Sequence, residues 1–266
     1  MAIEAIIDAR PHRAGAVRRG IGEALLPVGF ALVCLVAIEV LVRAMALPEV
    51  LLPPPSRVLA ALAANAGVLL HHGILTMVQV AGALVLSIML GILLAAVFSL
   101  VPILNDMYAP LLVILQIVPK IALAPLFVVW LGTGAPSHLG FAVFLSFFPM
   151  LIAAQAGFED SSADAVRLCR ALGASPLQTL LHVRMPMALP QLFVGAKIGA
   201  TLCIIGVVMG EFISAQAGIG WYILQAAALS QTANLIAALI MLSILGLAVF
   251  GLVSAGEIYV RRRFYG

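Results

Sequence analysis

Charged residues are scarce in this chain of 266 residues: Asp, Glu, Lys and Arg make up 9% of it, whereas 64% is hydrophobic. A soluble domain carries about 25% charged residues, so the composition excludes a soluble globular enzyme. The same hydrophobicity excludes a disordered chain. The three cysteines lie far apart, without a Cys-x-x-Cys pair or a neighbouring histidine pair. We therefore expect neither a metal site nor a disulfide framework.

Long stretches of the sequence contain no charged residue at all, namely 73–105, 121–158 and 212–256. Unbroken apolar runs of about 20 residues predict transmembrane helices, because the strands of a membrane barrel would alternate in polarity. The segment 213–234 is rich in Gly, Gln and Ser and is predicted to be a surface or re-entrant loop. The fold class predicted is an all-α, polytopic bundle. Its six spans are predicted at roughly 24–46, 73–101, 108–132, 137–157, 188–212 and 235–258.

The basic residues predict the orientation of these spans, because cytoplasmic loops carry an excess of Lys and Arg. With six spans, the three basic regions fall on one side, so both termini are expected in the cytoplasm and the chain in the inner (cytoplasmic) membrane of a bacterium. The predicted organisation is a basic segment 1–22, one transmembrane domain 23–260 and a basic tail 261–266. The arginines that decide this are Arg10, Arg13, Arg18, Arg19, Arg167, Arg170, Arg184, Arg261, Arg262 and Arg263.

The polar segment 158–187 is predicted to form two short helices separated by a glycine. Ser161 or Ser162 can cap the first helix, with Asp164 in its first turn. Gly173 follows where a helix C-terminus favours a left-handed residue. One face of this helix is apolar (Ala165, Leu168, Cys169 and Leu172), and Arg167 and Arg170 take the other.

Ser175 begins the second helix, with Pro176 at its first position and Gln178 placed to complete a capping box. Its apolar face is formed by Leu177, Leu180 and Leu181. Pro186 and Pro190 are expected to end this helix and begin the fifth span. Two interpretations remain open: a linker that lies against the membrane, or a docking element for a cytoplasmic partner.

The run 170–190 resembles the EAA loop of ABC importer permeases. Gly173 falls on the glycine of that motif, and the two prolines just named fall on its prolines. Residues 167–169 read Arg-Leu-Cys where the family usually has Glu-Ala-Ala. The acidic residue is therefore missing, and Asp164, one turn earlier, is the candidate to replace it.

Further stretches resemble one subfamily of these permeases, those for nitrate, sulfonates, taurine and thiamine-precursor pyrimidines. Residues 52–58 read Leu-Pro-Pro-Pro-Ser-Arg-Val, a stretch that precedes the second span. Residues 119–126 and 130–134 resemble a segment typical of the subfamily. Glu211 with Gly-Ile-Gly at 218–220 is similar to its Glu…Gly-x-Gly pattern. The substrate class implied is a small anionic or polar solute.

The resemblance implies the type I importer fold, with a second, identical permease chain, two copies of a separate ATPase and a soluble substrate-binding protein. ATP and Mg²⁺ would then belong to the ATPase, because this chain has no Gly-Lys-Ser/Thr P-loop. The chain is accordingly expected to be a transport subunit and not an enzyme. The residues implied in coupling to the ATPase are Asp164, Arg167, Leu168, Arg170, Leu172, Gly173, Ala174, Ser175, Pro176 and Gln178.

Two charged residues are candidates for the translocation pathway. Lys120 lies within the third predicted span, where a charge is costly. It either attracts an anionic substrate, or it pairs with carbonyls freed at a break caused by Pro119 and Pro125. Glu211 is expected to cap the outer end of the fifth span, with a role in a gate as the second interpretation.

Other residues are given structural roles. Ion pairs are expected between Glu39 and Arg43 and between Glu257 and Arg261, each four residues apart. The histidines at 71–72 are placed in a loop and are poor metal ligands, since no acid or cysteine lies nearby. Two Gly-x-x-x-Gly patterns permit close helix packing in the fifth span: Gly195/Gly199 and Gly206/Gly210.

The sequence disfavours two other classes of membrane protein. A stand-alone secondary carrier or channel needs paired intramembrane charges for ion coupling, and this chain offers isolated ones. An intramembrane enzyme is disfavoured because the sequence contains neither His-Glu-x-x-His nor Gly-x-Ser-x-Gly.

Overall fold

The computed structural model of this chain describes residues 21–101, 103–104 and 117–264, and within them it contains helices and no strand. The all-α fold predicted from the sequence is therefore confirmed. The elements are α1 (Ile21–Ala44), α2 (Pro55–Ala64), α3 (Ala66–Leu100), the 3₁₀ turn η2 (Lys120–Leu123), α5 (Ala124–Leu131), α6 (Ala135–Glu159), α7 (Ala163–Ala171), α8 (Pro176–Thr179), the π-helical turn η3 (Leu180–Arg184), α9 (Met185–Ser214), α10 (Ile219–Ala228) and α11 (Thr232–Phe264).

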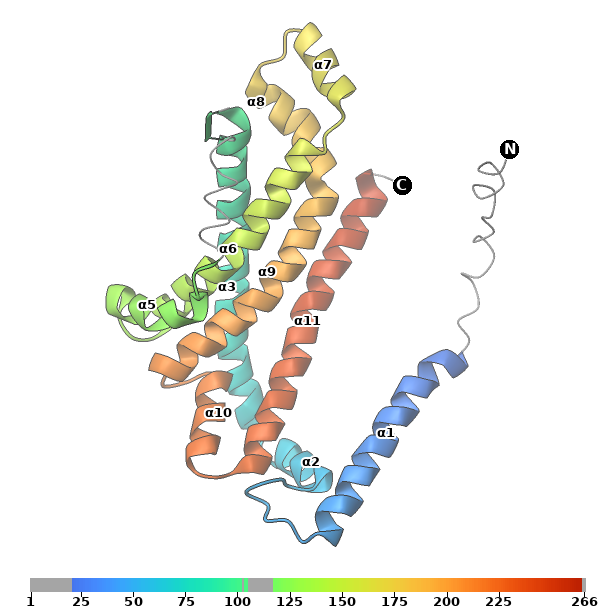
Figure 1. The fold of residues 1–266 in the computed structure, drawn as a ribbon, viewed down its shortest axis with the longest axis vertical. Coiled ribbons are helices and arrows are strands. Elements are labelled where there is room, and N and C mark those ends of the chain that lie inside the picture. The colour runs from blue at the N-terminus through green and yellow to red at the C-terminus, as the bar shows by residue number, and fades with distance from the viewer. Residues whose placement is uncertain (1–20, 102, 105–116, 265–266) are drawn as a thin grey trace, which may run out of the picture.

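Within the described residues, four helices are long and apolar enough to cross a membrane: 66–100, 135–159, 176–214 and 232–263. The shortest of them, α6, has 25 residues and at 1.5 Å per residue is about 37 Å long, which exceeds a hydrocarbon core of about 30 Å. Figure 1 shows α3, α6, α9 and α11 running along one another as the body of the bundle.

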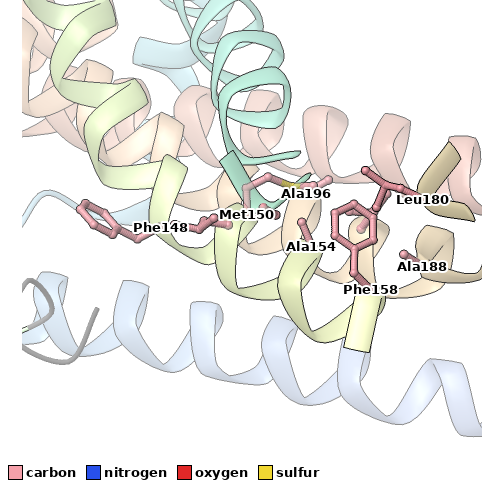
Figure 2. Packing of buried hydrophobic residues seen from close by; sticks show 10 residues of the cluster. Phe148, Met150, Ala154, Phe158, Leu180, Ala188 and Ala196 are labelled. Atoms are coloured by element: carbon pink, nitrogen blue, oxygen red, sulfur yellow. The ribbon is translucent and has the colours of Figure 1, made fainter. Parts of the chain in front are cut away.

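The centre of the bundle is the packing of α6 against α9, with α3 beside both helices. Figure 2 shows part of this core: Met150 and Phe158 of α6 lie near the small side chains of Ala188 and Ala196 of α9. Leu180 of η3 closes the same cluster and is buried. Alanine and glycine let the two backbones approach closely, which is how helices without a hydrophobic driving force between them associate in lipid.

The third predicted span, 108–132, is not one continuous helix. Residues 105–116 lie outside the described residues, and in the described part the helix ends before Pro119, after which η2 and α5 follow. A proline provides no N–H and disfavours helical backbone in the residue before it, so the break falls at Val118–Pro119. Lys120 therefore begins a new turn and does not lie inside a regular helix.

Pro186 and Pro190 do not separate the second loop helix from the fifth span, which corrects the prediction. Helix 176–214 is continuous, and η3 joins α8 to α9 within it. In a regular α-helix the ring of Pro186 would clash with the carbonyl of His182. The wider π-helical turn at Leu180–Arg184 contains that carbonyl and accommodates the proline.

Two further predictions are wrong about local structure. The segment 213–234 is not a loop, because α10 occupies Ile219–Ala228 and α11 begins at Thr232. The histidines at 71–72 lie on helix α3, which begins at Ala66 and is longer than the predicted span. The helix at Ile219–Ala228 is apolar but has ten residues, too few to cross a membrane, so the length of apolar runs alone could not reveal it.

Helix α1 stands apart from the bundle in Figure 1 and contacts α2. The predicted pair of Glu39 and Arg43 is confirmed, with Arg43 Nε 2.6 Å from Glu39 Oε1. Ser56 of α2 joins it: its backbone N–H donates to Glu39 Oε2 at 3.0 Å, and its hydroxyl donates to Oε1 at 2.8 Å. The carboxylate thus ties α1 to α2.

Candidate functional site

The first helix of the loop is closed at both ends by hydrogen bonds that the sequence predicts. Ser162 Oγ accepts from the backbone N–H of Ala165 at 3.3 Å and caps α7. At the other end Gly173 has φ +81°. Its N–H donates to Arg170 O at 3.0 Å, and the N–H of Ala174 donates to Cys169 O at 3.0 Å. This pair of bonds is a Schellman motif, which needs a left-handed residue at this position.

The capping box of the second helix is also present. Ser175 Oγ accepts from the N–H of Gln178 at 3.2 Å, and Gln178 Oε1 accepts from the N–H of Ser175 at 2.8 Å. Pro176 occupies the first helical position, where no N–H is required. The loop is therefore a defined pair of short helices and not an irregular linker.

The loop buries one side and exposes another. Val166 and Leu180 turn inward and are buried, whereas Leu168 is 61% exposed and Leu172 is 78% exposed. The two exposed leucines belong to the predicted apolar face of α7. Arg167 lies 4.0 Å from Asp164 on the same exposed helix, so this acid has a partner within the loop.

Arg184 attaches the loop to the bundle, a role that sequence reasoning missed. It donates a hydrogen bond to Ser99 Oγ, near the end of α3, at 2.6 Å. Arg170 and Arg184 line a cavity of about 210 Å³ between that end of α3 and α8. The only sequence signal was a basic residue in the last turn before a span, and it does not identify the partner.

Lys120 lies beside an open cavity of about 490 Å³ between η2, α6 and α9. Its Nζ is 4.4 Å from the centre of the Phe148 ring, a cation–π contact. Gln191 and Ile198 of α9 line the same cavity. Among the described residues, no acid forms an ion pair with Lys120. Lys120 and Gln191 are the polar side chains of a lining that is otherwise apolar.

Glu211, the second pathway candidate, points into the interior of the chain and is 1% exposed. Its Oε2 accepts from the N–H of Gly220 at 2.7 Å, and its Oε1 is 2.7 Å from Thr76 Oγ1. The carboxyl group therefore caps the start of α10, whereas the sequence suggested a cap at the end of the fifth span. A role in a gate stays a prediction.

Comparison with known families identifies the class of protein to which the chain belongs. Residues 87–262 match the family of binding-protein-dependent transport system inner membrane components. The chain belongs to this family. It is an ABC importer permease.

Relatives with assigned names span most of the permease. It is 31% identical over 203 residues to a probable ABC transporter permease protein of Haemophilus influenzae, covering 76% of this chain and 83% of the relative. It is 29% identical over 235 residues to the formylaminopyrimidine transport permease protein ThiX of Halalkalibacterium halodurans, covering 88% and 94%. The taurine transport system permease protein TauC of Escherichia coli is 29% identical over 201 residues, covering 73% of each chain.

A solved structure confirms the fold of the permease. A chain of the MetNI methionine ABC transporter in an inward-facing conformation superposes with a TM-score of 0.63 at 19% sequence identity. The match covers 72% of this chain and 96% of that chain. Neither the sequence relatives nor this structure identifies the substrate of the permease.

The four glycines singled out in the fifth span lie on the side of α9 that packs against α6. A Cβ built on Gly206 would lie 2.5 Å from Ala142 Cα, and one on Gly210 would lie 2.8 Å from His138 Cα. Gly195 is similarly close to Ala153, and Gly199 has ordinary van der Waals contacts. In the structure these glycines pack within one chain.

The acidic residue at the end of the sixth span has a different partner from the one predicted. Glu257 of α11 pairs with Lys197 of α9, and not with Arg261. Lys197 lies within an apolar span, so an acid on the neighbouring helix offers it a partner away from water.

Proposed function

We propose that two copies of this permease form the membrane pathway of an ATP-driven importer, and that the 158–187 loop couples this pathway to two ATPase subunits. The observation that carries the proposal is the loop itself: two capped helices, fixed by a left-handed glycine, that leave Leu168 and Leu172 exposed. Exposed leucines on a defined helix are a surface that a partner groove can bury. ATP and Mg²⁺ would be bound by the ATPase and not by this chain.

The distribution of charge supports a cytoplasmic position for the loop. Figure 1 shows α7 and α8 at the same end of the bundle as the last turn of α11, with α10 at the opposite end. That last turn carries Arg261, Arg262 and Arg263. Together with Arg167, Arg170 and Arg184 they form an excess of basic residues at one end, which supports a cytoplasmic position for that end.

Alternating access then requires that the loop contacts differ in energy between the two states of the ATPase dimer. Continuity between α8 and α9 provides a direct mechanical link, because helix 176–214 runs from the loop through the whole bundle. Movement of the loop would displace α9, and α9 would carry α6, against which it packs most extensively. The spans would rock as rigid bodies.

The substrate class supported best is a small anionic or polar solute, delivered from outside by a soluble binding protein. Lys120 beside its cavity supports this class, and relatives named for taurine and formylaminopyrimidine transport support small polar solutes. A nitrate, sulfonate or taurine would meet the Lys120 ammonium, and an uncharged pyrimidine precursor would rely on Gln191 and the Phe148 ring.

The experiment that tests the function is purification of the full chain from its native membrane in a mild detergent, with every co-purifying protein identified. An ATPase recovered at roughly one per permease supports the proposal. A double variant, Leu168→Glu with Leu172→Glu, should lose the ATPase. Leu229→Glu is the matched control, because Leu229 is 64% exposed and follows α10 at the opposite end.

Two results would overturn the proposal. One is recovery of the same amount of ATPase with the double variant as with the unchanged chain. The other is a chain that purifies alone and still transports in vesicles without ATP, which would favour the secondary carrier.

A further inference from the structure

Three polar residues on one face of α3 each bond to a different part of the bundle, at the end opposite to the coupling loop. His72, Thr76 and Gln79 are spaced by four and three residues, so they lie above one another on the helix. His72 Nδ1 accepts from the N–H of Gly218 at 3.2 Å. Gln79 Oε1 is 3.1 Å from His138 Nδ1 of α6. Thr76 lies between them and meets Glu211.

The carboxyl group of Glu211 fills the space beside the turn from α9 to α10. A Cβ on Gly218 would lie 2.2 Å from Glu211 Oε1, and a Cβ on Gly220 would lie 2.9 Å from Oε2. Gly218 also has φ +113°, which L side chains rarely adopt. Both glycines are thus required by the position of this one carboxyl group, which explains the Glu…Gly-x-Gly pattern of the sequence.

No cation neutralises Glu211 among the described residues, since none of the ion pairs there includes it. The titratable groups on the packed helices are His72 of α3, His138 of α6 and Tyr222 of α10. His72 Nδ1 accepts a hydrogen bond and so carries no proton there. His138 directs its two ring nitrogens to Gln79 and to Ser214. A buried carboxylate without a counter-charge is costly, whereas a neutral carboxylic acid with hydrogen-bond partners costs far less to bury.

The hydrogen bonds of Thr76 are compatible with a neutral Glu211 and use more of its bonding capacity in that form. Its hydroxyl has one proton to donate and two lone pairs. Thr76 Oγ1 accepts from the N–H of Ile219 at 2.8 Å, and it lies 3.2 Å from the backbone oxygen of His72 and 2.7 Å from Glu211 Oε1. If Glu211 donates a proton to Oγ1, Thr76 can donate to His72 O, and every group has a partner. If Glu211 is ionised, Thr76 must donate to it and gives up its bond to His72 O, which keeps the α-helical bond from the backbone N–H of Thr76.

We propose that Glu211 is a proton-binding site, a carboxylic acid held neutral that donates to Thr76 and fixes the α9–α10 turn on α3. Glu211 is then a positioning residue for α10 at the outer end of the bundle. Ionisation removes the donor and releases the turn. The proposal goes beyond the transport function and does not depend on coupling to the ATPase.

The side-chain variants distinguish an acid from an anion. Glu211→Gln keeps one donor for Thr76 and one acceptor for Gly220, so it should preserve the turn. Glu211→Ala removes both bonds, and Glu211→Asp withdraws the carboxyl group by one methylene. Glu49→Gln is the matched control, because Glu49 is exposed and pairs with Arg57 outside this network.

The first measurement is the infrared spectrum of the purified full-length chain at pH 7. The carbonyl stretch of a neutral carboxyl group should be present in the unchanged chain and in Glu49→Gln, and should be lost in Glu211→Gln. The second is amide hydrogen exchange of residues 215–228. Exchange should be unchanged in Glu211→Gln and about tenfold faster in Glu211→Ala and Glu211→Asp, because the turn loses buried hydrogen bonds.

The dependence on pH has a defined sign. In the unfolded chain this glutamate is ionised at neutral pH, so opening of the turn releases a proton and a rise in pH favours the open state. Exchange of 215–228, corrected for its intrinsic rate, should rise with pH in the unchanged chain and not in Glu211→Gln. The proposal is overturned if the neutral carboxyl band is absent at pH 7, or if Glu211→Gln exchanges as fast as Glu211→Ala.

Discussion

Lys197 of α9 forms an ion pair with Glu257 of α11, although 60 residues separate them in the chain. Both side chains are about one quarter exposed. The local alternative, a pair of Glu257 with Arg261 on the same helix, would leave Lys197 without an acid inside the bundle. The ion pair therefore joins α11 to α9 near the end that carries the 158–187 loop.

A double-mutant cycle on Lys197→Met and Glu257→Gln should show this pairing. We expect a coupling free energy of about 0.6–2 kcal/mol, the range for polar contacts between membrane helices. The measurement is chemical unfolding of the purified chain in detergent. Arg261→Gln combined with Glu257→Gln is the control cycle and should show a smaller coupling. A larger value for the control than for the Lys197 cycle would contradict the structure.

The close packing of α6 and α9 predicts that the glycines of α9 differ in how well they tolerate alanine. Gly206→Ala should lower the free energy of unfolding by about 1–3 kcal/mol, the usual cost of overpacking, since the added Cβ would meet the backbone of Ala142 at 2.5 Å. Gly199→Ala on the same helix is the control, because its Cβ would meet its nearest neighbours at 3.7 Å, an ordinary contact. Thermal unfolding of the two variants side by side tests this, and equal losses would contradict it.

Features decided by neighbours in the sequence could be predicted, and features decided by distant partners could not. The caps at Ser162, Gly173 and Ser175 depend on three or four consecutive residues, and all are present. The partner of Glu257 depends on which face of α11 meets α9, and no local pattern carries that information. Glu211 illustrates both cases. Its spacing from the two glycines can be read from the sequence, whereas its burial against Thr76 cannot.

Gly173 should be replaceable by asparagine and not by valine. A β-branched residue held at φ +81° would destabilise the turn by about 1–2 kcal/mol, whereas asparagine tolerates the left-handed region. No atom lies within 4 Å of a Cβ built there, so the effect comes from the backbone alone. In a reconstituted complex, Gly173→Val should uncouple ATP hydrolysis from uptake without affecting membrane insertion.

The control for that experiment is Gly173→Asn, which should keep the ratio of ATP hydrolysed to substrate taken up near that of the unchanged complex. Normal coupling in Gly173→Val would show that the loop does not transmit movement. The proposed role of the 158–187 segment would then have to be abandoned.

The last prediction concerns Lys120 and the charge of the substrate. Lys120→Met should slow the uptake of an anionic solute by about tenfold or more, because two unit charges about 4 Å apart near a protein surface attract by about 4 kcal/mol before desolvation. Lys120→Arg keeps the charge beside Phe148 and serves as the control. The measurement is the initial rate of uptake into vesicles as substrate concentration is varied. If both variants transport like the unchanged chain, the lysine has a structural role at the break before η2, held by the aromatic ring and by carbonyls freed at Pro119.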